Sequence, residues 1–172
     1  MPTLPIITVP DPLLRKISAP VDRVDAAILK LADDMLETMY AAPGIGLAAV
    51  QVGVLRRLVV LDVSESEDRT QPMVLFNPEI LALGSETRVH EEGCLSIPDV
   101  KFDIERPATA TIGYIDRAGK RQELAAEGLL ATALQHEIDH LNGKLIIDFL
   151  SRLKRDIVVK KFKKQSRGEA PL

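Results

Sequence analysis

The chain has 172 residues, 46% of them hydrophobic and 27% charged, which is the composition of a globular protein with one domain. No stretch approaches the roughly 18 apolar residues of a membrane helix, and the N-terminus does not resemble a secretory signal, so we expect a cytoplasmic protein with no membrane partner. The single cysteine, Cys94, excludes an internal disulfide and agrees with a reducing compartment.

The first element that the sequence predicts is a helix over residues 25–41. Asp25 is suited to cap its start, and Pro43-Gly44 should end it. Its apolar residues recur every three or four positions and form one stripe, made of Ile28, Leu31, Met35 and Met39. We expect this stripe to face the core.

The middle of the chain is expected to be extended. Runs of β-branched residues or a two-residue alternation predict the strands, and a turn at 117–120 joins the last two. The predicted segments are 56–63, two short pieces within 74–83 on either side of Asn77-Pro78, 108–115 and 121–126. We expect these short strands to pair mostly antiparallel.

Two more helices are predicted toward the C-terminus, over residues 128–141 and from about 149 to 164. The expected apolar faces are Leu130, Leu134, Ile138 and Leu141 in the first helix, and Leu150, Leu153, Ile157 and Val158 in the second. The expected fold class is therefore α+β, with short, mostly antiparallel strands around a central helix that carries the sequence HEIDH, and with flanking N- and C-terminal helices.

The central helix contains QHEIDH at residues 135–140. His136 and His140 are four residues apart, so they lie one turn apart on nearly the same face and can bind one metal ion. Glu137 follows the first histidine, as in the H-E-x-x-H arrangement, where the metal acidifies a water molecule and the glutamate takes its proton. Two inward imidazoles without partners would be costly, which favours a metal site over a chance pair.

A catalytic metal site needs a third protein ligand, and the residues alone leave several candidates. The metzincin pattern fails, because Ile146 occupies the position of its third histidine. The remaining candidates are Asp148 and Glu169 downstream and His90 and Cys94 upstream. A thiolate at Cys94 would be a strong ligand for zinc or ferrous iron.

Three short motifs follow one another along the chain, namely GIGLAAVQ at 44–51, EEGCLS at 91–96 and QHEIDH at 135–140. In this order they closely resemble the three motifs of the peptide deformylases of the bacterial, long-tailed type. The likeness extends to the opening VPDPLLRKISAPV and covers the chain to about residue 165. It implies a hydrolase that removes the N-formyl group from the N-terminal formylmethionine of nascent peptides and releases formate.

The resemblance implies a metal centre and its acid–base partner. Cys94, His136 and His140 would bind one divalent metal ion, and Glu137 would be the general acid and base. The family commonly uses Fe²⁺, which Zn²⁺, Ni²⁺ or Co²⁺ can replace. Metal-activated water is a suitable nucleophile for formamide hydrolysis at neutral pH.

The resemblance also assigns the groups around the substrate. Gln51 and the backbone N–H of Leu95 would stabilise the developing oxyanion, and Gly46 would bring backbone groups to the extended peptide. Candidate substrate-binding residues are Ile45, Gly46, Leu95, Leu129 and Ala133. The side chains of Ile45, Leu129 and Ala133 could equally be ordinary core residues.

Some positions near these motifs are distinctive. His90 stands where the family usually has an aliphatic residue, and Lys101 stands where arginine is frequent, which bears on how the peptide is held. Glu92 and Arg106 match positions that pair in the family. We therefore predict a structural ion pair between them.

Charge is distributed unevenly along the chain. The net charge is −3, but residues 148–172 hold eight Lys or Arg and three acids, so this segment carries +5 and residues 1–147 carry −8. We expect 1–147 to be a single catalytic domain and 148–172 to be its basic C-terminal helix and tail. Family members of the long-tailed type end in a helix that can dock on the ribosome near the exit tunnel, so the resemblance implies this contact and the basic charge agrees with it. A solvated helix packed on the body is the alternative, and DNA is not an expected partner.

Two other functions remain open at this level. An H-E-x-x-H peptidase would cleave internal amide bonds, whereas a metal-binding protein without activity would need neither Glu137 nor Gln51. The presence of both residues argues against the second alternative. A comparison of formylated with acetylated or internal peptides would distinguish the first.

Overall fold

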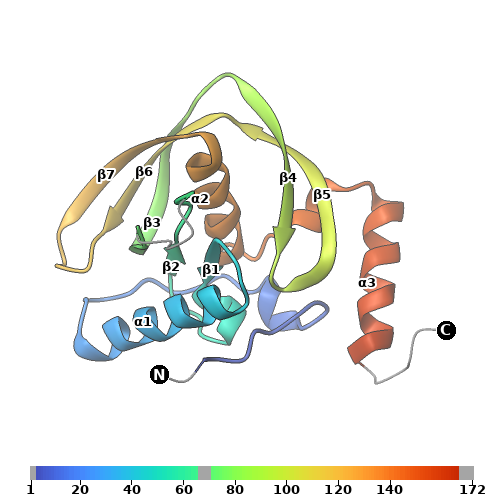
Figure 1. Cartoon of the computed structure of the whole chain (residues 1–172), viewed down its shortest axis with the longest axis horizontal. Helices are drawn as coiled ribbons and strands as arrows, with labels where there is room; N and C mark the ends of the chain where they lie inside the picture. The colour runs from blue at the N-terminus through green and yellow to red at the C-terminus, as the bar shows by residue number, and fades with distance from the viewer. Residues whose placement is uncertain (1–2, 66–70, 167–172) are drawn as a thin grey trace.

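A computed structural model of the chain describes residues 3–65 and 71–166 (Figure 1). The helices are η1 (Pro12–Arg15), α1 (Ala26–Ala41), η2 (Ala49–Val52), α2 (Gly128–Leu141), η3 (Ile146–Phe149) and α3 (Arg152–Ser166), where η denotes a 3-10 helix. The strands are β1 (Gly46–Ala48), β2 (Leu58–Leu61), β3 (Met73–Leu83), β4 (Thr87–Cys94), β5 (Ile97–Pro107), β6 (Thr109–Ile115) and β7 (Arg121–Glu127). Glu169, one of the candidate ligands, lies outside the described residues with the end of the basic tail.

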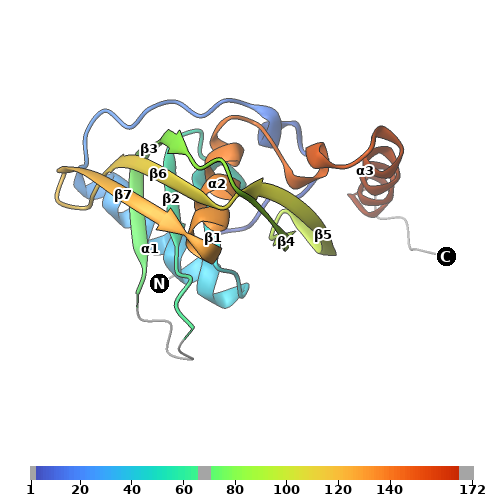
Figure 2. The same ribbon diagram turned by 90° about the horizontal axis from the view of Figure 1, so that it is seen from above.

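The strands form two antiparallel sheets. One sheet has the order β1-β2-β3-β6-β7, and β4 pairs with β5 in the other. Helix α2 contacts strands of both sheets, and β4 and β5 curve past it in Figures 1 and 2. This arrangement confirms the expected α+β class with antiparallel strands.

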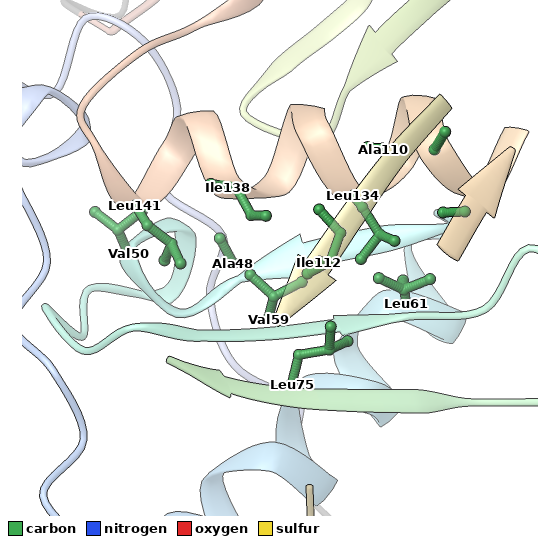
Figure 3. Packing of buried hydrophobic residues seen from close by; sticks show 12 residues of the cluster. Ala48, Val50, Val59, Leu61, Leu75, Ala110, Ile112, Leu134, Ile138 and Leu141 are labelled. Carbon is green, nitrogen blue, oxygen red and sulfur yellow. The ribbon is translucent and has the colours of Figure 1, made fainter. Parts of the chain in front are cut away.

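A helix covers each face of the larger sheet, α1 on one and α2 on the other. Its strand β2 is therefore buried at all of its positions. Side chains alternate between the two faces of a strand, so a strand covered on both sides is apolar throughout. The cluster on the α2 face, drawn in Figure 3, includes Val59, Leu61, Leu134 and Ile138. The cluster on the α1 face includes Leu58, Val60, Met35 and Met39. The first cluster holds α2 against one face of the sheet, and the second holds α1 against the other.

The helices predicted at 25–41 and 128–141 are confirmed within one residue. Asp25 caps α1, since its Oδ1 accepts a hydrogen bond from Ile28 N at 3.0 Å. The predicted stripe of α2 is buried at Leu134, Ile138 and Leu141. None of the helices in the two described ranges combines the length and the apolar character needed to cross a membrane.

The prediction of two separate extended pieces within 74–83 is wrong, because β3 runs through Asn77-Pro78 without a break. Its pairing with β6 shifts register between Phe76 and Glu79, and Asn77 has a φ of 50°. Asn77 tolerates this left-handed conformation, and its side chain bonds the backbone N and O of Val21 at 2.7 and 2.8 Å. The strand therefore bends at this point instead of ending.

The second sheet was not predicted. In β4 the buried residue is Glu92, so an apolar alternation is absent there, whereas β5 does alternate through Val100, Phe102 and Ile104, a signal that was missed. Strand β1 is short and was interpreted only as part of a glycine-rich motif. Both elements carry residues of the candidate site.

The C-terminal helix differs from its prediction in start and in packing. It begins at Arg152, and η3 precedes it. Leu153 and Ile157 are 71% and 61% exposed, whereas Val158, Val159 and Phe162 pack on the body of the protein. Apolar residues on this helix form two adjacent stripes, and the stripe that includes the large Phe162 is the one that is buried.

Candidate metal centre

Two imidazoles from α2 and one thiol from β4 converge. His136 and His140 are buried on successive turns, and their Nε2 atoms lie 3.2 Å apart. Cys94, the last residue of β4, places Sγ 3.3 Å from His140 Nε2, and the three ligand atoms lie within 4.8 Å of one another. Ligand atoms around a tetrahedral metal ion are about 3.3–3.6 Å apart. The set therefore has the spacing and the donor chemistry of a metal site.

The two imidazoles have opposite tendencies to carry a proton. Burial disfavours the charged form of His136, but the charge of Glu137 and hydrogen bonds to Cys94 and Glu92 raise its pKa well above the ordinary value. Burial and the charge of His136 lower the pKa of His140 well below its ordinary value. Two imidazole nitrogens that face each other this closely cannot both carry a proton, and a divalent cation is a suitable partner for both.

His136 is oriented by a buried ionic network. Its Nδ1 lies 3.0 Å from Glu92 Oε1, and Arg106 donates to both oxygens of Glu92 at 2.7 and 3.0 Å. Arg106 also donates to Asp139 at 2.8 Å, which ties β5 to α2. The predicted ion pair between Glu92 and Arg106 is thus confirmed. A partner on Nδ1 leaves Nε2 of His136 free to face a metal ion.

The charge of Glu92 is stabilised by the same network. Burial alone would raise the pKa of this carboxyl, but hydrogen bonds from His136 and Arg106 and their charges hold it below its ordinary value. Glu92 is therefore a carboxylate that accepts from His136 Nδ1. Carboxylate partners of this kind fix the ring orientation of metal-binding histidines.

Glu137 is buried beside the histidines, and its Oε1 has no hydrogen-bond partner among the described residues. Burial raises its pKa to about 7, against the charges of His136 and Arg106. A Cβ on Gly46 would lie 2.5 Å from Glu137 Oε2, so only glycine fits at this position of β1. A buried carboxyl with an unsatisfied oxygen is suited to take up and release a proton at neutral pH.

Gln51 is held with its amide nitrogen toward Cys94. Its Oε1 accepts from Ala48 N at 2.9 Å, and its Nε2 donates to Ser96 Oγ at 3.1 Å and contacts Cys94 Sγ at 3.6 Å. The side chain is 1% exposed, which excludes an ordinary surface amide. Its amide nitrogen therefore lies beside the Cys94 thiol, with one N–H held by Ser96.

A cavity of about 380 Å³ opens beside these groups. It is lined by every predicted substrate-binding residue, namely Ile45, Gly46, Leu95, Leu129 and Ala133, together with Gln51, Cys94, His136 and Glu137. His140 is buried behind this wall. The volume suits a side chain or a short peptide segment.

The other candidates for the third ligand are engaged elsewhere. His90 lines the cavity, but its Nδ1 lies 3.4 Å from Arg88 Nη2. Asp148 accepts from Arg15 Nη1 at 2.7 Å. Within residues 3–65 and 71–166, the group with metal-binding geometry is Cys94, His136 and His140.

Sequence reasoning missed several residues at the site. Thr132 and Glu91 line the cavity, Ser96 holds Gln51, and Asp139 holds Arg106. Asp139 is part of the HEIDH segment, three residues after His136, which is the spacing of neighbours on one helical face. Its partner was not predicted, because Arg106 comes from β5, which is distant along the chain and was not recognised as a strand.

Comparison with known proteins shows one consistent family. The family model described as polypeptide deformylase matches residues 3–156. The chain is 58% identical to a protein named peptide deformylase from Mesorhizobium japonicum, over 99% of this chain and 97% of that protein. It is also 58% identical to the peptide deformylase of Rhizobium meliloti, over 95% of this chain and 94% of that protein.

Solved structures give the same result for the fold. The crystal structure of peptide deformylase from Ehrlichia chaffeensis superposes with a TM-score of 0.91 at 43% identity, covering 97% of this chain and 98% of that chain. A second structure of that enzyme, in complex with actinonin, has a TM-score of 0.91 at 44% identity, covering 97% of this chain and 99% of the other. The likeness therefore extends over the whole architecture.

Proposed function

Since the chain belongs to the peptide deformylase family, whose metal-dependent members remove the N-formyl group from nascent peptides, we propose how its residues divide this work. The observation that carries the proposal is the convergence of one thiol and two imidazoles beside a buried carboxyl in a cavity. The reaction is hydrolysis of a linear amide, which releases formate and leaves methionine at the N-terminus.

Cys94, His136 and His140 bind the metal ion, and Fe²⁺ is the proposed native ion. A thiolate with two imidazoles is a donor set for zinc or ferrous iron, and electron donation by the thiolate makes iron a suitable choice. When bound, the ion supplies an activated nucleophile at neutral pH and polarises the formyl carbonyl. Zn²⁺, Ni²⁺ and Co²⁺ are expected to substitute.

Glu137 is the proposed general acid and base. Its carboxyl takes a proton from the attacking water and gives a proton to the leaving amine. Its buried position, its unsatisfied Oε1 and its pKa of about 7 support this role. The metal ligand His136 is its neighbour on α2, so both act on the same side of the cavity.

Gln51 and the backbone N–H of Leu95 are the proposed donors to the oxyanion. The two contacts of the Gln51 amide with Ala48 and Ser96 support this assignment, because they fix its orientation before substrate binds. A donor that is already oriented costs no rearrangement during the reaction.

The substrate is proposed to bind as an extended peptide between β1 and β4. Each of these strands is at the end of its sheet, so each has one unpaired backbone edge. The methionine side chain enters the cavity, where Ile45, Leu129 and Ala133 provide apolar walls and Gly46 permits close approach of backbone. Lys101 and His90 also line this cavity and are suited to contact the rest of the peptide.

The basic C-terminal helix is proposed to contact the ribosome, and the enzyme to act in the cytoplasm, where nascent chains emerge. Basic side chains on α3 are exposed at Arg152, Lys154, Lys160, Lys161, Lys163 and Lys164. Phosphate-rich RNA attracts such a surface. In this proposal residues 1–147 form the catalytic domain, and binding of α3 to the ribosome places that domain close to nascent chains.

The experiment that tests the proposed roles compares formyl-Met, acetyl-Met and internal peptides with wild-type protein and Glu137→Gln. We expect turnover of the formylated peptide alone, and a loss of about 10²–10⁴-fold in kcat for Glu137→Gln with the metal retained. Equal cleavage of an internal peptide would support the peptidase alternative instead. Full activity of Glu137→Gln would overturn the acid–base assignment.

A further inference from the structure

Phe149, the last residue of η3, covers the face of a buried guanidinium. The Cζ atom of Arg106 lies 4.7 Å from the centroid of the Phe149 ring. Arg106 is 5% exposed, whereas Phe149 is 49% exposed. The ring thus has one side against Arg106 and much of its surface toward solvent.

The contact completes the surroundings of Arg106. The N–H groups of a guanidinium lie in its plane, and here Nε and Nη2 donate to Glu92 while Nη1 donates to Asp139. The faces of the group make no hydrogen bonds, so an aromatic ring is the suitable cover for them. Phe149 therefore limits both the movement of Arg106 and the access of water to its ion pairs.

Arg106 acts directly on the partner of His136. Oε1 of Glu92 accepts from Arg106 Nη2 at 3.0 Å and lies 3.0 Å from His136 Nδ1. A shift of the guanidinium moves this carboxylate, and a shift of the carboxylate turns the imidazole. Such outer contacts change metal affinity although they do not touch the ion.

We propose that Phe149 is a positioning residue of the metal centre, acting through Arg106 and Glu92 on the orientation of His136. The inference rests on the metal ligands given under Proposed function. It links the segment that leads into α3 to the site, since η3 joins α2 to α3. Stacking on the guanidinium requires an aromatic face, so an aliphatic residue of similar volume cannot replace Phe149.

Three substitutions at exposed apolar positions separate the aromatic contact from a general effect of side-chain size. Phe149→Leu keeps an apolar side chain and removes the π face, whereas Phe149→Tyr keeps the face. Leu153→Ala truncates another exposed apolar residue, four residues farther along the chain in α3, which belongs to none of the buried clusters. Because Phe149 is half exposed, we expect these proteins to fold, and thermal unfolding checks it.

The test measures the dissociation constant for Zn²⁺ by chelator competition and the visible spectrum of cobalt-loaded protein. Phe149→Leu should bind Zn²⁺ about threefold to tenfold more weakly and shift the cobalt bands, while Phe149→Tyr and Leu153→Ala stay within about twofold of wild type. Wild-type affinity and spectrum in Phe149→Leu would overturn the proposal, as would an equal loss in Phe149→Tyr or in Leu153→Ala.

A parallel variant separates this proposal from the ligand assignment on which it rests. Cys94→Ala should remove nearly all Zn²⁺ affinity in the same assay. If Cys94→Ala binds like wild type, the proposed ligands are wrong. If Cys94→Ala loses the metal while Phe149→Leu does not change it, the ligands stand and the role of Phe149 fails.

Discussion

Gly46 and Glu137 are so close that a Cβ at position 46 would lie 2.5 Å from Glu137 Oε2. The two residues come from different elements, since β1 belongs to the large sheet and α2 packs across it. Substitution by alanine must therefore displace either the strand or the carboxyl. The absence of a side chain at Gly46, in the first motif, thus leaves the space that the Glu137 carboxyl of the third motif occupies.

The first prediction concerns this contact. Gly46→Ala should push Glu137 away from its position and lower kcat by about 10²-fold, since displacements near 1 Å at a reacting group have effects of that size. The bound metal should remain, because the atoms nearest to the added Cβ belong to Glu137 and not to a proposed ligand. Steady-state kinetics with metal analysis on the same sample measures both. An unchanged kcat in a Gly46→Ala variant with a full complement of metal would contradict the prediction, because it would show that Glu137 keeps its position beside a Cβ.

The second prediction concerns the pair of Glu92 with Arg106. Glu92→Gln leaves a buried guanidinium with one carboxylate instead of two and should cost about 3 kcal/mol of unfolding free energy. It should also weaken metal binding, since His136 loses a charged partner. Denaturant unfolding measures the first effect, with Glu91→Gln, an exposed neighbour, as control. If Glu92→Gln and Glu91→Gln have equal free energies of unfolding, the ion pair between Glu92 and Arg106 does not stabilise the fold.

The third prediction concerns Asp148 and acid. Burial would raise the pKa of Asp148, but hydrogen bonds from Arg15 and Leu145 N and the charges of Arg15 and Arg155 hold it below the ordinary value. A lowered folded-state pKa stabilises the protein above the unfolded-state value of about 3.9. This contribution should disappear as pH falls through the folded-state pKa.

Asp148→Asn should therefore be less stable than wild type at pH 7, by less than about 1 kcal/mol because the group is partly exposed. The difference should shrink steadily below about pH 4. Unfolding curves across this range test the sign, with Asp156→Asn on the exposed side of α3 as control. A difference that grows on acidification would contradict the assignment.

The fourth prediction concerns α3. Replacement of Lys154, Lys160, Lys161 and Lys164 by Glu reverses exposed charges and leaves the packed residue Phe162 in place. Ribosome co-sedimentation should fall strongly and lose its dependence on salt, while turnover of a short formylated peptide stays unchanged. Co-sedimentation at the wild-type level would leave α3 as a solvated helix packed on the body.

Helical periodicity predicted α1 and α2 closely, because each helix buries one apolar stripe against the large sheet. It misplaced the packed face of α3, where charged residues surround two possible stripes and only the tertiary contact of Phe162 decides between them. The second sheet was missed for two reasons. Strand β4 buries Glu92 and has no apolar alternation, and the alternation of Val100, Phe102 and Ile104 in β5 was overlooked.

The residues of the candidate metal centre could be predicted more completely than the sheet of β4 and β5, to which Cys94 belongs. The motifs indicated Cys94, His136 and His140, and the structure brings their ligand atoms together. Periodicity cannot supply the groups that orient them, since Asp139, Ser96 and Phe149 act through contacts between distant segments. Such contacts depend on the arrangement of β4, β5 and η3, which no local pattern specifies.

X-ray absorption at the metal edge of protein purified without oxygen, with metal stoichiometry on the same sample, tests the proposed metal centre most directly. We expect one divalent ion per chain, mainly iron, with one sulfur and two imidazole nitrogens from protein, and loss of the sulfur signal in Cys94→Ala. A loaded, active protein whose metal has no sulfur ligand would contradict the proposed centre.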